Sequence, residues 1–398
     1  GGVDRLLSDA TLSTSLLSFY SDEEKIQLRH HLYQVFQQPG LSETDRQAAF
    51  EALGRNQELQ ELQRSTLAFV TACCHNQPNF GSFLLESVEV ASGNNTSMLA
   101  HLILNSSQFY HQAPSVLASA YGLISDIWDQ GFEKKERFLR GFGDQVGEFW
   151  KAVAYPLLET VPLEYPQQPA HPEMMAEYSS KMEVCSFSLR LIASKLMVHH
   201  KKRQDDPLIE DLKRKLSSVP NGDPNGPKLL DIWFHSFCTF DTPSRELATS
   251  SKSALEMGVN LALFEKLPVP LPGSRTYSDN YIYDTKLLGK VLNQNFKRSG
   301  EATYKEERRN CLISLSQTNA KLGAADAQLF AIQSLKKFME VYCMIPMAEE
   351  ESGGGGGGMD TKHILTSNVL HVFRSLSSKS STSSIVLQEL TQLFLILL

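Results

Sequence analysis

Residues 114–131 read PSVLASAYGLISDIWDQG, and this stretch decides which kind of fold to expect. Pro114 suits the first turn of a helix, where its missing N–H costs no hydrogen bond. Gly131 is a stop signal at the other end. Between them, apolar residues recur in steps of three and four, which places them on one wide helix face: Val116, Leu117, Ala120, Tyr121, Ile124, Ile127 and Trp128. The stretch therefore predicts a helix with one buried face.

Similar stripes follow one another from Leu12 to Leu398, separated by loops rich in Pro, Gly, Ser and Asn. One predicted helix ends before Pro78, because the residue preceding a proline is disfavoured in the helical region. Its apolar face carries Leu59, Leu62, Thr66, Leu67, Val70, Cys73 and Cys74. We expect a short helix through Phe83, Leu84 and Val88 to come next.

Farther along, Pro156 should kink or end the helix that contains Phe149 and Trp150. A long periodic helix is predicted from about Glu173 to Lys202, and further stripes follow Lys362 and Ser384. No alternating strand pattern is convincing, and Tyr277–Tyr283 comes nearest to one.

These patterns predict an all-α fold, an α-solenoid of stacked HEAT- or armadillo-like helical repeats. At about 40 residues per repeat, the 398 residues would hold roughly nine or ten. We expect residues 1–346 to form a solenoid segment and residues 362–398 to continue it. Between them, residues 347–361 carry an acidic run and six glycines, which predict a flexible loop or linker. The start at Gly1 and the end within an apolar stripe lead us to expect a fragment of a larger chain.

Composition narrows the function classes. Apolar residues make up 41% and charged residues 21%, as in a folded soluble protein. A net charge of −7 and a pI near 5.9 argue against nucleic-acid binding. No run reaches the 18 or so apolar residues of a membrane span. Six cysteines without a C-x-x-C pair predict buried reduced thiols rather than a zinc site or a disulfide framework.

The sequence offers no convincing reactive centre. Gly141–Gly147 reads G-x-G-x-x-x-G, one residue too long for the dinucleotide fingerprint, and predicts a turn between helices. The adjacent pairs His30-His31 and His199-His200 point to different helix faces, unlike a metal-binding i, i+4 pair. His199–Arg203 is better explained as cations at a helix C-terminus than as a localisation signal. We therefore predict no enzyme and no catalytic, cofactor or metal residues, with partner-binding residues unknown.

Three tryptophan-bearing or cysteine-bearing motifs occur in an order that resembles a known family. They are Ile127-Trp128-Asp129-Gln130, Phe149–Leu157 (FWKAVAYPL), and Met182–Ile192 (MEVCSFSLRLI). A Pro-rich loop separates the second motif from the third. The stretch from Ser115 to Leu216 resembles the middle region of the large scaffold nucleoporins of the inner ring, the family of the one-hundred-and-eighty-eight-kilodalton nucleoporin. Trp128, Trp150 and Trp233 themselves are expected in the core.

The resemblance implies a structural role in the nuclear pore complex at the nuclear envelope, supporting protein and mRNA transport. It implies partners among other nucleoporins, notably linker segments such as that of the ninety-three-kilodalton nucleoporin, and possible transport factors. It carries no catalytic residue over. A mobile HEAT-repeat transport receptor or adaptor is the main alternative, although such receptors usually present larger acidic faces than Glu349–Glu351. A helical enzyme or its regulatory subunit is the second.

Overall fold

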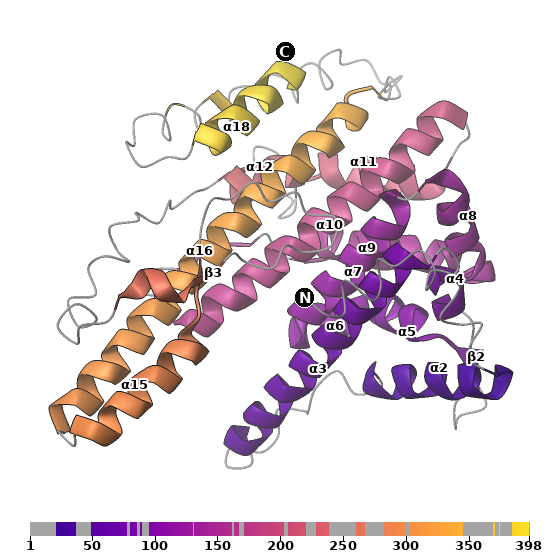
Figure 1. The fold of residues 1–398 in the computed structure, drawn as a ribbon. Helices are drawn as coiled ribbons and strands as arrows, with labels where there is room; N and C mark the ends of the chain where they lie inside the picture. The colour runs from indigo at the N-terminus through magenta and orange to yellow at the C-terminus, as the bar shows by residue number, and fades with distance from the viewer. Residues whose placement is uncertain are drawn as a thin grey trace. The chain divides into compact units, whose positions relative to one another are not determined.

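The computed structural model describes residues 21–36, 49–77, 80–85, 88–89, 95–129, 131–160, 163–166, 171–202, 206–219, 228–238, 260–266, 282–299, 302–344, 369–370, 374 and 384–397. These residues are mostly helical (Figure 1), which confirms the predicted all-α class. The predicted linker 347–361 lies outside the described residues.

The chain groups into two compact units. Unit 1 comprises Gly1–Val161, Phe187–Ser218 and Leu271–Ser274, and unit 2 comprises Pro162–Ser186, Val219–Pro270 and Arg275–Leu398. The long helix α10 (Pro172–Lys202) therefore contributes its first part to unit 2 and its second part to unit 1. Its bounds match the predicted helix from Glu173 to Lys202.

Unit 1 consists of the second part of α10, further helices and one small hairpin. They are α2 (Asp22–Phe36), α3 (Ala49–Asn76), α4 (Phe80–Leu85), β1 (Val88–Glu89), β2 (Asn95–Thr96), α5 (Met98–Leu104), α6 (Ser106–Gln112), α7 (Pro114–Asp129), α8 (Phe132–Arg140), η2 (Gly143–Gln145), α9 (Val146–Leu158) and α11 (Pro207–Ser217). Helix α7 is buried nearly all round, and α3, α5, α6 and α8 pack against it.

The buried face of α3 differs from the predicted one. Leu62 was expected inside but is 54% exposed, whereas Gln63 is fully buried. The Gln63 side chain donates through Nε2 to the Val35 carbonyl, 2.9 Å away, in the last turn of α2. Because helix-end carbonyls lack helical partners, this bond explains why a polar residue takes the inner position. The inner face continues through Leu67, Val70 and Cys74.

The predicted helix through Val88 is also wrong in part. Helix α4 ends at Leu85, and Val88 lies in β1, where it pairs antiparallel with Thr96 of β2. Both residues are β-branched, which suits an extended backbone better than a helix. Ser97 then caps α5, since its hydroxyl accepts from the Ala100 N–H at 3.1 Å.

Pro156 does not end α9, and the carbonyl that it leaves without a helical donor is hydrogen-bonded by other groups. The helix runs on to Leu158. A proline cannot donate to the carbonyl four residues earlier, so the Ala152 carbonyl loses its helical partner. Two side chains replace it: the Tyr121 hydroxyl donates at 2.8 Å and the Ser106 hydroxyl at 3.1 Å. The prolyl position thus ties α9 to both α6 and α7.

An aromatic cluster fills the space between α7, α8 and α9. The Trp128 ring stacks on Phe149 at 6.0 Å between centroids and meets Trp150 edge-on at 6.1 Å. Phe138 and Phe142 complete the cluster. The Lys135 ammonium lies 5.3 Å from the Trp128 ring and donates to the Ser194 hydroxyl at 2.7 Å, which joins the second part of α10 to the cluster. Trp128 and Trp150 are buried, as predicted.

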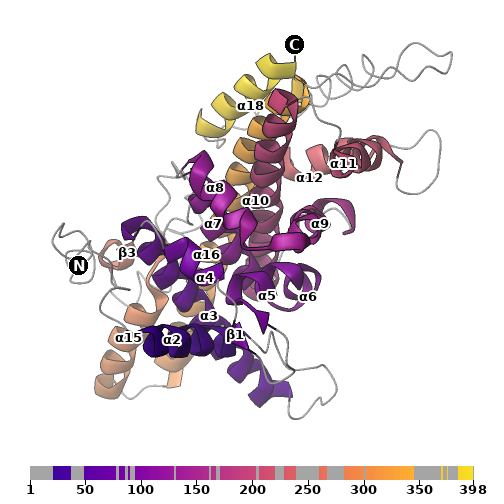
Figure 2. The ribbon, with the colours of Figure 1, turned by 90° about the vertical axis from the view of Figure 1, so that its right-hand side faces the viewer.

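Unit 2 is organised around one long helix. Its elements are the first part of α10, α12 (Leu229–Cys238), η3 (Leu261–Phe264), β3 (Glu265–Lys266), β4 (Ile282–Tyr283), α15 (Thr285–Ser299), α16 (Ala302–Tyr342) and α18 (Ser384–Leu397). Helices α15 and α16 lie side by side, and α18 packs along the later part of α16 (Figures 1 and 2). Only Ile282 and Tyr283 of the candidate strand Tyr277–Tyr283 are described, and they form β4.

Polar side chains fix the packing onto α16. Asn319 accepts from the Tyr283 N–H and donates to the Tyr283 carbonyl, both at 2.8 Å, so one amide satisfies the end of β4. Gln328 donates to the buried Tyr178 hydroxyl of α10 at 3.0 Å. Lys336 pairs with Glu389 of α18 at 2.6 Å. Trp233 on α12 is buried, as predicted.

Four cysteines, Cys73, Cys74, Cys185 and Cys311, are free and buried, as predicted. Cys343 is free but exposed, so the prediction is wrong for that residue. Among the described residues, no helix is long and apolar enough to cross a membrane.

The role of Pro156 can be tested with a double-mutant cycle. Tyr121→Phe removes a hydrogen-bond donor from the buried Ala152 carbonyl. It should lower the free energy of opening of α9 by about 1–2 kcal/mol, so that the amides of α9 exchange faster. Pro156→Ala restores an N–H at position 156, so Tyr121→Phe should cost roughly half as much or less in that background. Tyr155→Phe, which removes a hydroxyl that lies near His111 Nε2 and not at the Ala152 carbonyl, is the control. An equal cost in both backgrounds would contradict the explanation.

A second prediction concerns pH. Burial raises the pKa of Asp231 above its ordinary 3.8, although the Lys228 N–H and ammonium oppose the shift. The folded state then holds this proton more tightly than the unfolded state, so the contribution of Asp231 to stability falls as pH rises above about 4. The stability of Asp231→Asn relative to the wild-type protein should increase between pH 4 and 6 in urea unfolding.

Asp211 provides the opposite case. Its hydrogen bond to Arg214, and then the Lys215 ammonium, lower its pKa. Asp211→Asn should therefore lose stability relative to wild type as pH rises toward about 4, because the change falls between the lowered pKa of the folded state and the ordinary pKa of 3.8. Slopes of the same sign for the two variants would refute this assignment.

Candidate functional site

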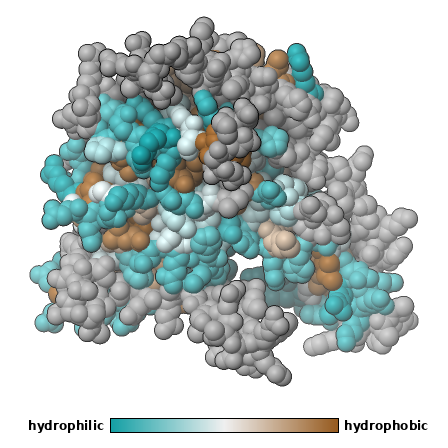
Figure 3. Space-filling model, turned by 180° about the vertical axis from the view of Figure 1, so that it is seen from behind, coloured by the Kyte–Doolittle hydropathy of each residue, from teal (hydrophilic) through white to brown (hydrophobic). Residues whose placement is uncertain are grey.

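The described surface shows no large apolar area on the face drawn in Figure 3. Hydrophobic residues there form small patches separated by hydrophilic ones. Large exposed apolar side chains are mostly dispersed, with Leu62 and Phe69 sharing one side of α3 as an exception. Single exposed apolar residues are ordinary and define no site. The described residues of unit 1 also form a groove.

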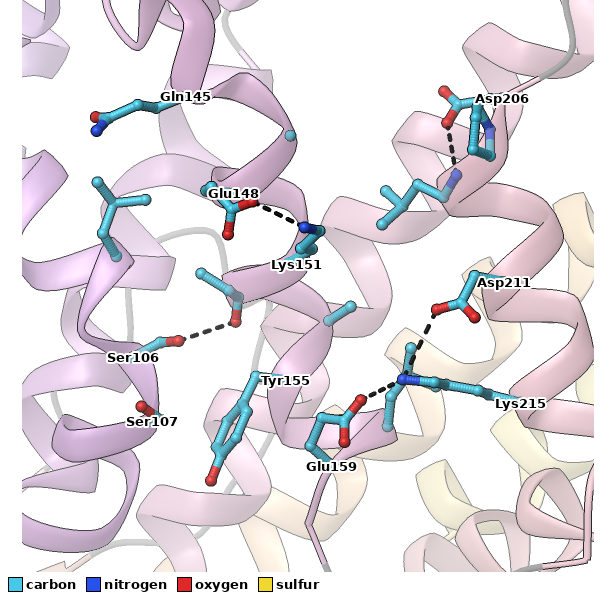
Figure 4. A pocket seen from close by; sticks show the side chains of 17 residues that line it. Ser106, Ser107, Gln145, Glu148, Lys151, Tyr155, Glu159, Asp206, Asp211 and Lys215 are labelled. Carbon is cyan, nitrogen blue, oxygen red and sulfur yellow. Dashed lines mark hydrogen bonds and ion pairs between the residues drawn. The ribbon is translucent and has the colours of Figure 1, made fainter.

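This groove, here called the α9–α11 groove, has a volume of about 860 Å³. It lies among the α5–α6 junction, α9 and the start of α11 (Figure 4). Its volume is in the range of small-ligand and peptide sites. Its lining residues are Leu104, Ser106, Ser107, Gln145, Gly147, Glu148, Lys151, Ala152, Ala154, Tyr155, Leu158, Glu159, Asp206, Pro207, Leu208, Asp211 and Lys215.

Helix periodicity brings the α9 residues together. Glu148, Lys151, Tyr155 and Glu159 follow one another at steps of three and four, so they share the face of α9 that lines the groove. The same periodicity puts Ala152 there. Its small side chain leaves room, and its carbonyl is occupied by Ser106 and Tyr121.

Ion pairs hold the walls. Lys215 of α11 bonds to Glu159 at the end of α9 and lies 3.7 Å from Asp211, as the dashed lines in Figure 4 show. Glu148 pairs with Lys151 at 2.8 Å. The hydrogen bond to Glu159, and then the charges of Glu159 and Asp211, raise the pKa of Lys215. Because these groups are largely exposed, each pair contributes little to stability, roughly 0–1 kcal/mol.

The start of α11 is closed to anions. Asp206 is the N-cap, and its Oδ1 accepts from the Leu208 N–H at 3.1 Å. Pro207 occupies the first helical position and has no N–H. Asp206 also pairs with Lys195 at 2.6 Å. A phosphate or carboxylate would therefore meet a carboxylate here instead of free donors.

The charges around the groove are balanced. Each of its four carboxylates has a cationic partner: Glu148 pairs with Lys151, Glu159 with Lys215, Asp206 with Lys195 and Asp211 with Arg214. At one edge the Tyr155 hydroxyl lies 3.2 Å from His111 Nε2, and the Tyr155 ring meets the ring of Tyr110 edge-on. The described lining residues include no His or Cys, and the Ser106 hydroxyl is committed to a carbonyl.

A second titratable pair lies elsewhere in unit 1. His75 Nε2 at the end of α3 is 2.7 Å from the Asp126 carboxylate of α7, whose side chain is only 7% exposed. Burial raises the pKa of Asp126, and His75 partly offsets this. The neighbouring Cys73 is a poor nucleophile, because burial raises its pKa to about 11. The pair joins α3 to α7.

The histidine pairs and the glycine motif of the sequence lie on separate elements. His30 and His31 lie within α2, and His199 lies near the end of α10. Gly141–Gln145 forms the predicted turn between α8 and α9, with Gly143 at a φ of +51°, whereas Gly147 already lies in the first turn of α9. Within the part of the chain that the structure describes, no group of three or more His, Cys, Asp or Glu side chains could hold a metal.

The groove could not be predicted from the sequence. Its lining residues come from three separate segments, residues 104–107, 145–159 and 206–215, and each segment has an ordinary surface pattern by itself. The sequence signal that could have indicated the groove is one helix face within residues 144–159. This face carries Glu148, Lys151, Tyr155 and Glu159 in steps of three and four. No protein-family model and no curated protein sequence matches the chain.

The ion pair of Lys215 with Glu159 should stabilise the packing of α11 on α9, and this contribution should depend on the salt concentration. Lys215→Met removes both ion pairs and should lower the protection of α11 in hydrogen exchange by about 0.5–1 kcal/mol at low salt. The loss should shrink in 0.5 M NaCl, because screening weakens the pairs in the wild type. Lys151→Met, whose partner is on its own helix, should leave α11 unchanged. Equal effects of the two substitutions would disprove this role.

Proposed function

We propose that the chain is a structural segment of the nuclear pore inner ring, which docks other nucleoporins and supports nucleocytoplasmic transport. The proposal rests on the resemblance of residues 115–216 to the large inner-ring scaffold nucleoporins. It places the protein in the nucleus, at the pore complexes of the nuclear envelope. It assigns no enzymatic activity.

One observation carries the proposal. The two tryptophan motifs of the resemblance, around Trp128 and around Phe149-Trp150, meet in a single aromatic cluster. The third motif contributes Cys185, Leu189 and Ile192 of α10, all of which are buried. The similar residues are therefore those that pack the helices together. This supports a shared helical framework rather than a chance similarity of surface residues.

The finer proposal is that the helices form repeats of an α-solenoid. Within unit 1, α3 packs against α7, and α5 and α6 pack against α9, so that helices repeatedly bury one face on helices farther along the chain. In unit 2, α15 forms an antiparallel pair with the first part of α16, and α18 packs on the later part of α16. Stacked pairs of this kind present long surfaces to extended partners, which suits a scaffold.

The expected partners are other nucleoporins, through linker segments such as that of the ninety-three-kilodalton nucleoporin, with transport factors as a further class. The mobile HEAT-repeat adaptor is the competing function. Both functions need docking surfaces and no reactive centre, so they differ in residence at the pore. Exchange kinetics in the cell therefore separates them.

Imaging of the full protein, tagged at its own locus, should show a punctate nuclear rim. Because a scaffold subunit is held by many contacts, its fluorescence should recover over hours after bleaching rather than within seconds. A tagged soluble transport receptor in the same cells is the control. A diffuse signal would refute the pore assignment, and a rim signal that recovers within seconds would favour the mobile adaptor.

A further inference from the structure

Helix α18 packs on the later part of α16 in the way that a bound peptide helix packs on its receptor (Figures 1 and 2). Its buried residues are Val386, Leu390, Leu393 and Leu397, each at most 5% exposed. Steps of four, three and four place them in one narrow stripe, the spacing of a coiled-coil seam. In the described part of unit 2, this helix packs mainly on α16. A single apolar stripe laid on one surface is the helix-in-groove mode of recognition.

Polar side chains fix the register of α18 on α16. Lys336 of α16 donates to Glu389 and to Gln392, both at 2.6 Å. Gln333, one turn earlier, donates to the other oxygen of Glu389 at 3.3 Å. The side chains of Lys336 and Glu389 are only 20% and 14% exposed. Because a charge held this far from water is costly without its partner, this face of α16 favours a helix with a carboxylate at that position and disfavours one with a cation.

Helix α15 packs on the first part of α16 in a different way. It ends at Ser299, directly before α16 begins at Ala302, and the two helices share an apolar core that contains Leu288, Leu292, Cys311 and Leu315. Helix α18 is joined to α16 through residues 343–383, which include six glycines. A connection of this composition imposes little preferred path. We therefore expect side-chain contacts, and not the connection, to hold α18 on α16.

A helix of 14 residues is marginally stable in water by itself, so α18 depends on α16 for its structure. We propose that the α16 face under α18 is a docking site for an amphipathic helix of a partner protein, and that α18 occupies this site as an intramolecular competitor. The partner helix carries apolar residues in steps of four, three and four, with a glutamate directly before the second of them, as in Glu389-Leu390. The inference rests on unit 2 alone and does not depend on the proposed location at the nuclear pore.

Competition by a tethered helix has a measurable consequence. A helix on a flexible connection competes at an effective concentration of about 1 mM. A free peptide with the α18 sequence should therefore bind the wild-type chain with an apparent Kd near this concentration, however tightly it binds the uncovered site. Glu389→Lys places a cation against Lys336 and should release α18, so the peptide should bind this variant about tenfold or more tightly than wild type.

The test measures fluorescence anisotropy of a labelled peptide of residues 384–398 with the full 398-residue chain. Leu395, which is 64% exposed, is replaced by Lys in the peptide to keep it soluble. The Glu389→Lys chain should bind this peptide and bind its Glu389→Lys form about tenfold more weakly. The Lys336→Glu chain should show the reverse preference. Loss of folding cannot produce this reversal.

A matched control and a second measurement locate the effect. Glu340→Lys makes the same charge change at an exposed position of α16 and should leave the affinity of the wild-type chain unchanged within about twofold. In hydrogen exchange, the amides of α18 should exchange faster in Glu389→Lys and in Lys336→Glu. The amides of α15 should keep their protection, which shows that the rest of unit 2 remains folded.

Three outcomes would overturn the inference. Neither released variant binds a peptide, each variant binds both peptides equally, or the wild-type chain binds the peptide as tightly as Glu389→Lys does. The presence or absence of a nuclear rim changes none of these results, so the docking site and the scaffold function fail independently.

Discussion

The packing of unit 1 depends on the Ala152 carbonyl, which Pro156 deprives of its helical donor. A buried carbonyl without a donor is costly, so the helix can continue only where other groups supply hydrogen bonds. The hydroxyls of Ser106 and Tyr121 do so, and in doing so they fix the distance and rotation of α6 and α7 against α9. The aromatic cluster then fills the space on the other side of α9, and the groove opens beside the same carbonyl. One covalent constraint thus sets both the core and the candidate site.

The groove and the core use polar groups in different ways. In the core, polar side chains such as Gln63 and Asn319 satisfy backbone groups that the ends of helices and strands leave open. In the groove, charged side chains pair with one another across α9 and α11 while staying in contact with water. The first kind specifies the fold. The second kind can be rearranged at small cost, as a surface that binds partners requires.

The sequence predicted the elements with the clearest periodicity and boundaries. The helix from Glu173 to Lys202 and the buried positions of Trp128, Trp150 and Trp233 agree with the structure. It failed where a distant partner decides the outcome. Gln63 is inside because of Val35, Pro156 is tolerated because of Ser106 and Tyr121, and Val88 pairs with Thr96 instead of continuing a helix. The groove was not predicted for the same reason: residues 104–107, 145–159 and 206–215 meet only after the chain folds.

The distribution of tryptophans makes the molecule its own optical reporter. Trp128 and Trp150 lie in unit 1 with ring centroids 6.1 Å apart, close enough for their electronic transitions to couple, while Trp233 belongs to unit 2. Near-ultraviolet circular dichroism should therefore be dominated by the coupled pair and follow unit 1. Tryptophan fluorescence typical of a buried ring that persists after unit 1 has unfolded, and the circular dichroism signal has been lost, would come from Trp233. The two halves of the chain can thus be watched separately without any added dye.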